Sequence, residues 1–214
     1  LEESKIYRTY MAGDVIAHAG SKLPYVGSIM GGVAALSRVF EDGRHQSVGL
    51  LMPGDFLGRP GRSLTHFDVI ALTEVELCGF QHKTFAMMLE KASDLRARMV
   101  EVMLDDLDAA RAWMMMLGRK TAREKLCSLL AYIAMHQDRL HQANQTDAQM
   151  IYLPLGREQI ADFLALTHET VSRQFTALTA DGLIEPVRKH VMRIPDKGRL
   201  IATAGEDNDG GMWT

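Results

Sequence analysis

One short segment of the chain carries polar residues whose types and spacing suit contact with nucleic-acid bases. A carboxylate such as Glu169 can accept a hydrogen bond from the amino group of cytosine or adenine. A guanidinium such as Arg173 can bond guanine bidentately or hold a phosphate, and Ser172 is short enough to let a helix approach closely. If Thr167 is a helix N-cap, His168, Glu169 and Thr170 lie in the first turn, and Ser172 and Arg173 share the same outer face. The candidate base-contacting residues are His168, Glu169, Thr170, Ser172 and Arg173.

Glu169 and Arg173 alone would also fit an ordinary solvated ion pair, because they are four residues apart on a helix. Their surroundings favour a helix-turn-helix over residues 156–182. Such a motif needs small residues at the helix crossing and in the turn, and Ala161 and Ala165 meet that need. The predicted inner face consists of Ile160, Phe163, Leu164, Val171, Phe175 and Leu178.

Basic residues crowd the stretch that follows the motif. They are Arg188, Lys189, Arg193, Lys197 and Arg199, with only Asp196 among them. Residues 183–186 and 191–194 read as two strands flanking residues 187–190, which predicts a hairpin wing. Because the net charge of the chain is -3, any DNA binding must rest on a local patch of this kind. Arg188 and Lys189 are the predicted phosphate contacts.

This region resembles the DNA-binding domain of the CRP/FNR family of bacterial transcription regulators. The resemblance rests on Arg157-Glu158-Gln159-Ile160-Ala161, Thr167-His168-Glu169-Thr170-Val171-Ser172-Arg173 and Asp181-Gly182-Leu183-Ile184. The E-x-x-S-R pattern is similar to the FNR and FixK branch, since the cyclic-AMP branch has glycine at the place of Ser172. The branch implies a palindromic site with TTGAT-like half-sites, and RNA polymerase as a second partner. His168 is a less typical occupant of its position.

The first part of the chain predicts a β-roll or jelly roll, so that the fold class is α+β. Short β-favouring runs alternate with glycines across residues 1–92, and Asp42-Gly43 is the clearest hairpin turn. The region resembles the sensor β-roll of the same family. Members that bind cyclic nucleotides carry G-E and R-S pairs there, whereas this chain has Gly58-Arg59 and Phe67-Asp68. An acid at the phosphate position would repel a phosphate, so no cyclic AMP binding is expected.

Cys78 stands where oxygen-sensing FNR proteins carry an internal cysteine that ligates an iron-sulfur cluster. A [4Fe–4S] cluster takes four thiolates, and the other three belong to an N-terminal segment in those proteins. Residues 55–62 are similar to FnrL-type members of the branch. The resemblance therefore implies that Cys78 is a metal ligand in the full-length protein. Without it, a lone cysteine in a strand reads as a small buried hydrophobe, which is also the interpretation of Cys127.

Residues 93–118 form the predicted dimerisation helix. The segment from Ser93 to Leu117 contains no glycine or proline, and Gly118 is expected to end the helix. Apolar residues recur in a strict three-four alternation, which is typical of a coiled-coil seam and predicts a homodimer. The seam consists of Val100, Met103, Leu107, Ala110, Met114 and Leu117. A helix packed on its own domain is the alternative, but a single long amphipathic helix between two domains is most simply explained as a dimer interface. Trp113, Met115 and Met116 lie off the seam and are expected to pack against the flanking domains.

The remaining domain boundaries follow from these motifs. Residues 119–202 form the predicted winged helix-turn-helix domain, opened by the capping box Thr121-Ala122-Arg123-Glu124, and residues 203–214 form a mobile tail. No apolar run reaches the length of a membrane span, and two cysteines fit a reducing cytoplasm. The chain begins at Leu1, so natural residues are expected upstream.

Two other functions stay open. One is a FixK-like regulator of the same family without a cofactor, controlled by its expression or by thiol oxidation. The other is a β-roll enzyme of the cupin type, which would need histidines spaced by one residue together with a carboxylate. No H-x-H occurs among the eight histidines. The sequence therefore predicts a DNA-binding regulator and not an enzyme.

Overall fold

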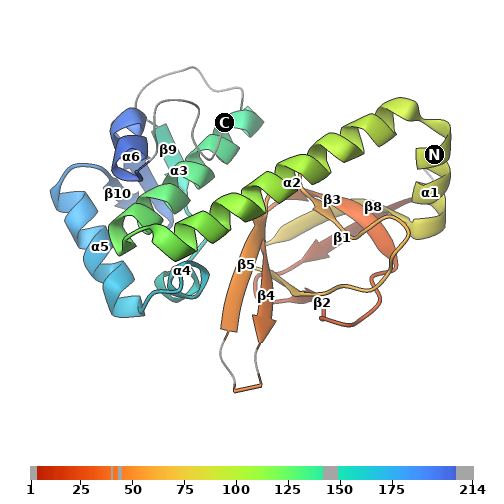
Figure 1. Cartoon of the computed structure of the whole chain (residues 1–214), viewed down its shortest axis with the longest axis horizontal. Helices are drawn as coiled ribbons and strands as arrows, with labels where there is room; N and C mark the ends of the chain where they lie inside the picture. The colour runs from red at the N-terminus through yellow and green to blue at the C-terminus, as the bar shows by residue number, and fades with distance from the viewer. Residues whose placement is uncertain (1–3, 40, 43–44, 142–148, 206–214) are drawn as a thin grey trace. The chain divides into compact units, whose positions relative to one another are not determined.

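The computed structural model describes the chain except for residues 1–3, 40, 43–44, 142–148 and 206–214 (Figure 1). The described residues divide into two compact units, Leu1–Asp106 and Leu107–Thr214. The first unit is mainly β and the second mainly α, which confirms the predicted α+β class. The long helix α2, Ser93–Arg119, contributes residues to both units.

The first unit contains two antiparallel sheets, each of four strands within the described residues. Strands of the first sheet lie in the order β1 (Lys5–Tyr10), β8 (Val75–Gln81), β3 (Tyr25–Gly31) and β6 (Phe56–Leu57). The second sheet has the order β2 (Val15–Ala17), β7 (Asp68–Ala71), β4 (Ala34–Val39) and β5 (His45–Leu51). Val39 pairs with His45, so the predicted Asp42-Gly43 hairpin is confirmed, although Gly43 lies outside the described residues.

Apolar side chains fill the space between the two sheets. The cluster includes Leu23, Ile29, Leu57, Val69 and Leu77, all at most 4% exposed. Tyr25 lies in the same cluster, and its hydroxyl hydrogen-bonds the Tyr10 hydroxyl at 2.8 Å. Burial raises the pKa of the Tyr25 hydroxyl, and the bond to Tyr10 adds to that effect. The β-roll interior is thus a packed core that includes the hydrogen-bonded pair of Tyr10 and Tyr25.

A second, smaller cluster covers the outer face of the β1-β8-β3-β6 sheet. It joins Val26 of β3 to Phe85 of helix α1 (His82–Lys91) and Met99 of α2. The sequence patterns did not reveal α1, β1 or β6. β1 is an edge strand whose middle residues are exposed, and β6 has only two residues, so neither gives a strong hydrophobic alternation.

Helix α2 ends at Arg119, two residues later than Leu117, because Gly118 does not interrupt it. The next helix, α3 (Ala122–His141), begins at the predicted capping box. The Thr121 backbone N–H donates to the Glu124 carboxylate at 2.7 Å, and the Glu124 N–H donates to the Thr121 hydroxyl at 3.3 Å. The first of these bonds holds the pKa of the Glu124 carboxyl below its ordinary value.

The second unit continues with β9 (Gln149–Tyr152), α4 (Arg157–Leu164), α5 (His168–Ala180), β10 (Glu185–Arg188), β11 (Val191–Ile194) and α6 (Lys197–Thr203). The three strands form one antiparallel sheet in the order β10-β11-β9. Ala204, the C-cap of α6, is fully buried, so the packed domain extends past the predicted boundary at residue 202. The rest of the predicted tail, 206–214, lies outside the described residues.

The free edge of β9 is covered by a side chain. The Gln137 amide of α3 donates to the Tyr152 carbonyl at 2.6 Å and accepts from the Tyr152 N–H at 3.0 Å. One primary amide thus satisfies both backbone groups that a further strand would otherwise pair with.

Candidate nucleic-acid interface

Helices α4 and α5 form the predicted helix-turn-helix. Ala165 is the C-cap of α4 and has left-handed backbone angles, φ 50° and ψ 52°. The Leu166 N–H donates to the Ala161 carbonyl at 2.9 Å, which closes the end of α4. A small residue suits the turn because a bulky side chain in the left-handed region is strained. The prediction that the small residue Ala165 lies in the turn between the two helices is confirmed.

Thr167 is the N-cap of α5, as predicted. Its backbone is extended, and its hydroxyl accepts a hydrogen bond from the Thr170 N–H at 3.2 Å. The cap fixes the first turn of α5, in which His168 and Glu169 are exposed. At the other end Asp181 is the C-cap, and Gly182 follows with φ +67°, where glycine adopts the left-handed conformation without strain.

The six residues of the predicted inner face are all buried, with at most 5% of any side chain exposed. The edge of this core is closed by Arg157, the first residue of α4. Its guanidinium carbon lies 3.1 Å from the centroid of the Phe175 ring, and desolvation lowers the pKa of Arg157. Sequence reasoning missed this contact, since an arginine at the start of a helix reads as solvated.

On the outward face, Glu169 and Arg173 are exposed, and Thr170 and Ser172 are half-buried. The solvated ion pair of Glu169 with Arg173, which the helical spacing allowed as an alternative, is not formed in the structure. The Arg173 guanidinium instead donates to the Thr170 hydroxyl at 3.4 Å, and that hydroxyl also bonds the Thr167 hydroxyl at 2.9 Å. Within the part of the chain that the structure describes, the Glu169 carboxylate has no hydrogen-bond or ion-pair partner. Its oxygens are therefore available to an external donor.

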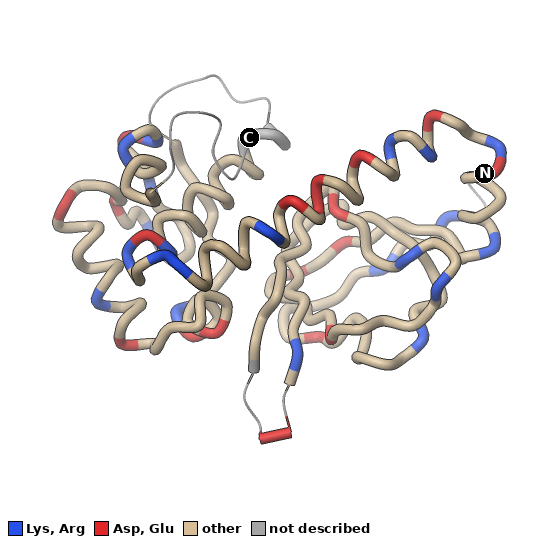
Figure 2. Tube along the Cα trace, in the orientation of Figure 1, with Lys and Arg blue, Asp and Glu red and all other residues tan. Residues whose placement is uncertain are grey.

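The predicted wing is present as β10 and β11, and its first strand reaches Arg188, two residues further than expected. Arg188 and Lys189 are exposed at its tip. The wing is braced by His190, whose Nδ1 lies 3.0 Å from the Leu153 carbonyl oxygen. Arg193 differs from the tip cations, because its guanidinium pairs with the Glu185 carboxylate at 2.9 Å. Figure 2 marks the positions of the basic residues in blue and of the acidic residues in red along the Cα trace.

Two further contacts connect α3 with the motif, and no sequence pattern indicated either of them. The Arg123 guanidinium pairs with the Asp181 carboxylate at 2.6 Å, at the end of α5. The Lys125 ammonium is buried and donates to the Leu164 carbonyl at 3.2 Å, at the end of α4. A basic residue in an amphipathic helix is normally read as part of the solvated face, so both residues read as surface charges.

The long helix α2 presents apolar residues to solvent. Val100, Met103, Leu107 and Met114 are between 45% and 67% exposed, Ala110 is also exposed, and Leu117 is half-buried. Trp113 and Met116 are buried as expected, and the Trp113 ring makes edge contacts with Tyr132 and Phe163 at 4.8 Å between centroids. Met115 is 64% exposed, which corrects the prediction that it packs against a domain.

Cys78 lies half-buried on β8, where inward and outward residues alternate. Its cross-strand neighbours are Tyr7 on β1 and Ser28 on β3, and Tyr7 is exposed. Cys127 is fully buried on α3, and burial raises the pKa of its thiol to about 11. The Cys127 thiol is therefore shielded from solvent, whereas the half-buried Cys78 thiol can contact an external group.

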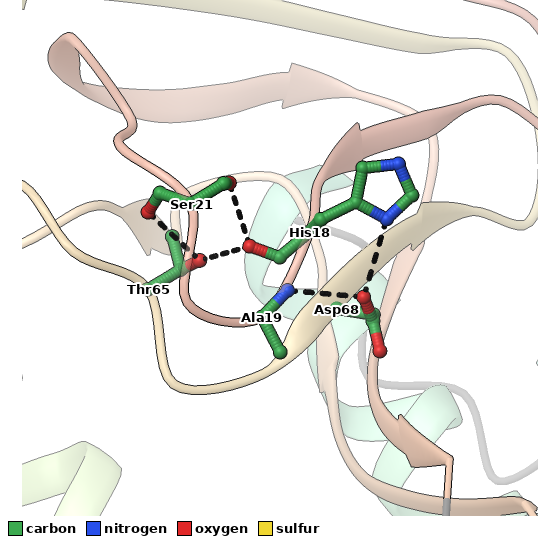
Figure 3. A network of polar contacts seen from close by, with 5 residues as sticks. All are labelled: His18, Ala19, Ser21, Thr65 and Asp68. Carbon is green, nitrogen blue, oxygen red and sulfur yellow. Dashed lines mark hydrogen bonds and ion pairs between the residues drawn. The ribbon is translucent and has the colours of Figure 1, made fainter.

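The carboxylate of Asp68 is engaged with the loop that follows β2 (Figure 3). It accepts a hydrogen bond from the Ala19 N–H at 3.0 Å and lies 3.5 Å from Nδ1 of His18. The Thr65 hydroxyl donates to the His18 carbonyl at 2.7 Å, which ties the same two loops together. Asp68 thus has a structural role at the place where the sequence predicted an acid opposite a phosphate.

Comparison with protein families divides the chain in the same way. A family described as "Cyclic nucleotide-binding domain" matches residues 7–92, and one described as "Crp-like helix-turn-helix domain" matches residues 124–203. Among solved structures, FixK2 from Bradyrhizobium japonicum has a TM-score of 0.80 at 23% identity, covering 93% of this chain and 96% of that one. A mutant of CooA from Carboxydothermus hydrogenoformans has a TM-score of 0.75 at 19% identity, covering 94% and 88%. These likenesses confirm the fold.

Relatives with higher identity carry the family assignment. The transcriptional activator protein FnrL of Cereibacter sphaeroides is 47% identical over 212 residues, which cover 99% of this chain and 86% of that protein. The nitrogen fixation regulation protein FixK of Bradyrhizobium diazoefficiens is 37% identical over 177 residues, covering 83% and 72%. These relatives are regulators and not enzymes, so the cupin alternative is set aside. With its β-roll, long helix and capped helix-turn-helix, the chain belongs to the CRP/FNR family of DNA-binding transcription regulators.

Proposed function

We propose that this chain is a homodimeric, oxygen-responsive transcription activator that reads a palindromic site with TTGAT-like half-sites. The observation that carries the readout is the Thr167-capped first turn of α5, which exposes His168 and Glu169 and brings Arg173 to the same face. Helices that enter the major groove contact bases with these first turns. In this arrangement Glu169, Ser172 and Arg173 contact bases, together with His168 and Thr170.

The wing supplies the positioning contacts. Arg188 and Lys189 are exposed and follow the recognition helix closely in the chain, so each is suited to hold a backbone phosphate. Arg193 is less suited, since the Glu185 carboxylate already compensates its charge.

The apolar stripe of α2 supports a dimer. An exposed row of valine, leucine and methionine on a 27-residue helix is costly in water, and a second copy of the helix would cover it. Two protomers would then present two recognition helices to two half-sites. Contact with RNA polymerase follows from the activator role, and the protein would work in the cytoplasm, where a bacterial chromosome lies.

The signal would enter through the β-roll. A [4Fe–4S] cluster takes four thiolates and supplies sensitivity to oxygen when bound. Cys78 fits one ligand position because its side chain lies on the outer face of β8, next to the exposed Tyr7. Among the described residues no group of three or more histidine, cysteine or acidic side chains could hold a metal. The sequence holds one further cysteine, the buried Cys127, so the other three thiolates would have to come from outside it, and the FixK-like alternative without a cofactor remains if none exist there.

A cyclic nucleotide is not the proposed effector, although the β-roll belongs to the domain class named for such ligands. Two observations support this. The family resemblance puts Asp68 at the phosphate position, and its carboxylate is bonded to Ala19 and lies next to His18. In addition, the apolar cluster that includes Tyr25 packs between the sheets.

Two measurements test the proposal. Site selection from random double-stranded DNA should return a palindrome with TTGAT-like half-sites, and a different consensus would overturn the half-site assignment. Anaerobic reconstitution of the protein with its natural N-terminal residues should give about four irons per chain with visible charge-transfer absorption, and Cys78→Ser should lose both. Absence of iron in the parent protein would favour the FixK-like alternative.

A further inference from the structure

The buried Lys125 of α3 has no role in the readout proposed above, yet its position is costly. Its side chain is 8% exposed, and removing an ammonium from water is unfavourable unless strong hydrogen bonds compensate. Its Nζ donates to the Leu164 carbonyl oxygen at 3.2 Å. Leu164 is the last residue of α4 and directly precedes the turn of the helix-turn-helix.

The acceptor of this bond lies at a point of backbone strain. A helix C-terminus carries partial negative charge on its last carbonyls, so a cation there is electrostatically favoured. The next residue, Ala165, holds left-handed angles that favour glycine over a residue with a Cβ. The turn therefore keeps a conformation that its own residue disfavours, with a buried cation bonded to the preceding carbonyl.

Helix α5 begins three residues after Ala165, at His168. A change in the turn would rotate the first turn of α5, and with it the exposed groups of Glu169 and Arg173. A hydrogen bond to a base is lost when its geometry is disturbed. A rotation of α5 about its axis should therefore affect discrimination between bases more than it affects the attraction to phosphates.

We propose that Lys125 is a positioning residue for sequence readout, which fixes the turn before the recognition helix without touching DNA. This deepens the proposed function and rests on α5 being the reading element. Its effect should appear in the preference for one sequence over another, while the general electrostatic attraction to DNA stays unchanged.

The experiment compares Lys125→Met and Lys125→Arg with the parent protein. The DNA is the site that the parent protein itself selects from random sequences, so the test does not depend on the TTGAT-like assignment. Affinity for that site is divided by affinity for a scrambled duplex of equal length. The matched control is Arg123→Met, which removes another cation from the same turn of α3. The Arg123–Asp181 pair is partly exposed, and such pairs contribute little.

Lys125→Met should lower the affinity ratio by about tenfold, on the order of the discrimination that one bidentate base contact supplies, because a displaced α5 would lose such a contact. The salt dependence of binding to the scrambled duplex should not change. Lys125→Arg, which keeps a cationic donor, should preserve the ratio, and Arg123→Met should change it by no more than about twofold. An unchanged ratio for folded Lys125→Met overturns the proposal. So does a salt slope lower by about one, because the ammonium would then contact a phosphate.

A second pair of variants covers the case in which Lys125→Met fails to fold. Lys125→Gln keeps a neutral donor, and Ala165→Gly removes the conformational penalty in the turn. If both residues act on the same turn, Ala165→Gly should restore part of the ratio that Lys125→Gln loses. Strictly additive effects of the two substitutions would show that Lys125 acts elsewhere.

Discussion

The guanidinium carbon of Arg157 lies over the Phe175 ring, 3.1 Å from its centroid, and joins the first turn of α4 to the buried face of α5. A desolvated cation–π contact of this kind contributes roughly 1–2 kcal/mol. Arg157→Met should therefore lower the free energy of unfolding of the DNA-binding domain by about 1 kcal/mol. The measurement is urea unfolding followed by Trp113 fluorescence in a Trp213→Phe background. Arg119→Met, at an exposed position, is the control and should leave the midpoint unchanged.

Replacing the base-reading residues should give sequence-dependent losses. Arg173→Ala should abolish preference for the selected site, and Glu169→Ala should relax discrimination at one base pair by about 1–3 kcal/mol. A gel-shift series with all four bases at each half-site position measures this. Equal losses on every sequence would mean that these side chains hold phosphates only.

The wing cations should behave in the opposite way. Arg188→Ala or Lys189→Ala should weaken binding to all sequences alike and lower the salt slope by about one for each phosphate that is no longer neutralised. Arg193→Ala is the matched control, because Glu185 already pairs with that guanidinium at 2.9 Å. Titration of DNA binding at several salt concentrations provides the slopes. If the slope of Arg188→Ala equals that of the parent protein, Arg188 does not contact DNA.

Two adjacent methionines on α2 allow a matched test of the dimer. Met114 and Met115 are 67% and 64% exposed, but only Met114 belongs to the three-four alternation. Met114→Glu and Leu107→Glu should therefore separate the protomers and remove binding to a full palindrome, since half-sites are roughly 34 Å apart. Met115→Glu should remain dimeric. Sedimentation measures whether each variant is a monomer or a dimer. A dimeric Leu107→Glu protein would refute the assignment of this seam as the dimer interface.

The two cysteines should react at different rates. Burial raises the pKa of the Cys127 thiol to about 11, so at pH 8 only about one thiol in a thousand is ionised, and the side chain is also inaccessible. Iodoacetamide should then modify Cys78 first, and Cys127 should react only as the pH approaches 11 or after unfolding. Mass spectrometry of the cluster-free protein identifies the modified residue. Equal labelling of both at pH 8 would contradict the buried position of Cys127.

The elements with strong local signals could be predicted from the sequence. The Thr121–Glu124 capping box and the Thr167 N-cap involve residues three apart in the chain, so the residue types at that spacing reveal them. The buried faces of α4 and α5 likewise follow from the helical period. The same period explains why the apolar row of α2 could be recognised.

What could not be predicted depends on partners far away in the chain. Lys125 and Leu164 are 39 residues apart, and Arg157 meets Phe175 only after α4 and α5 have packed. The choice of Thr170 over Glu169 as the partner of Arg173 is a matter of side-chain geometry on one helix turn. Helical spacing allows both partners, so it could not decide between them.

The bonds between Gln137 and the Tyr152 backbone have a consequence for association between molecules. An uncovered strand edge can recruit a strand from another protein and grow into a shared sheet. With both hydrogen-bonding groups of Tyr152 occupied by one amide, β9 offers no template at this residue. A strand from a second molecule could therefore extend the sheet past Tyr152 only by displacing the Gln137 amide.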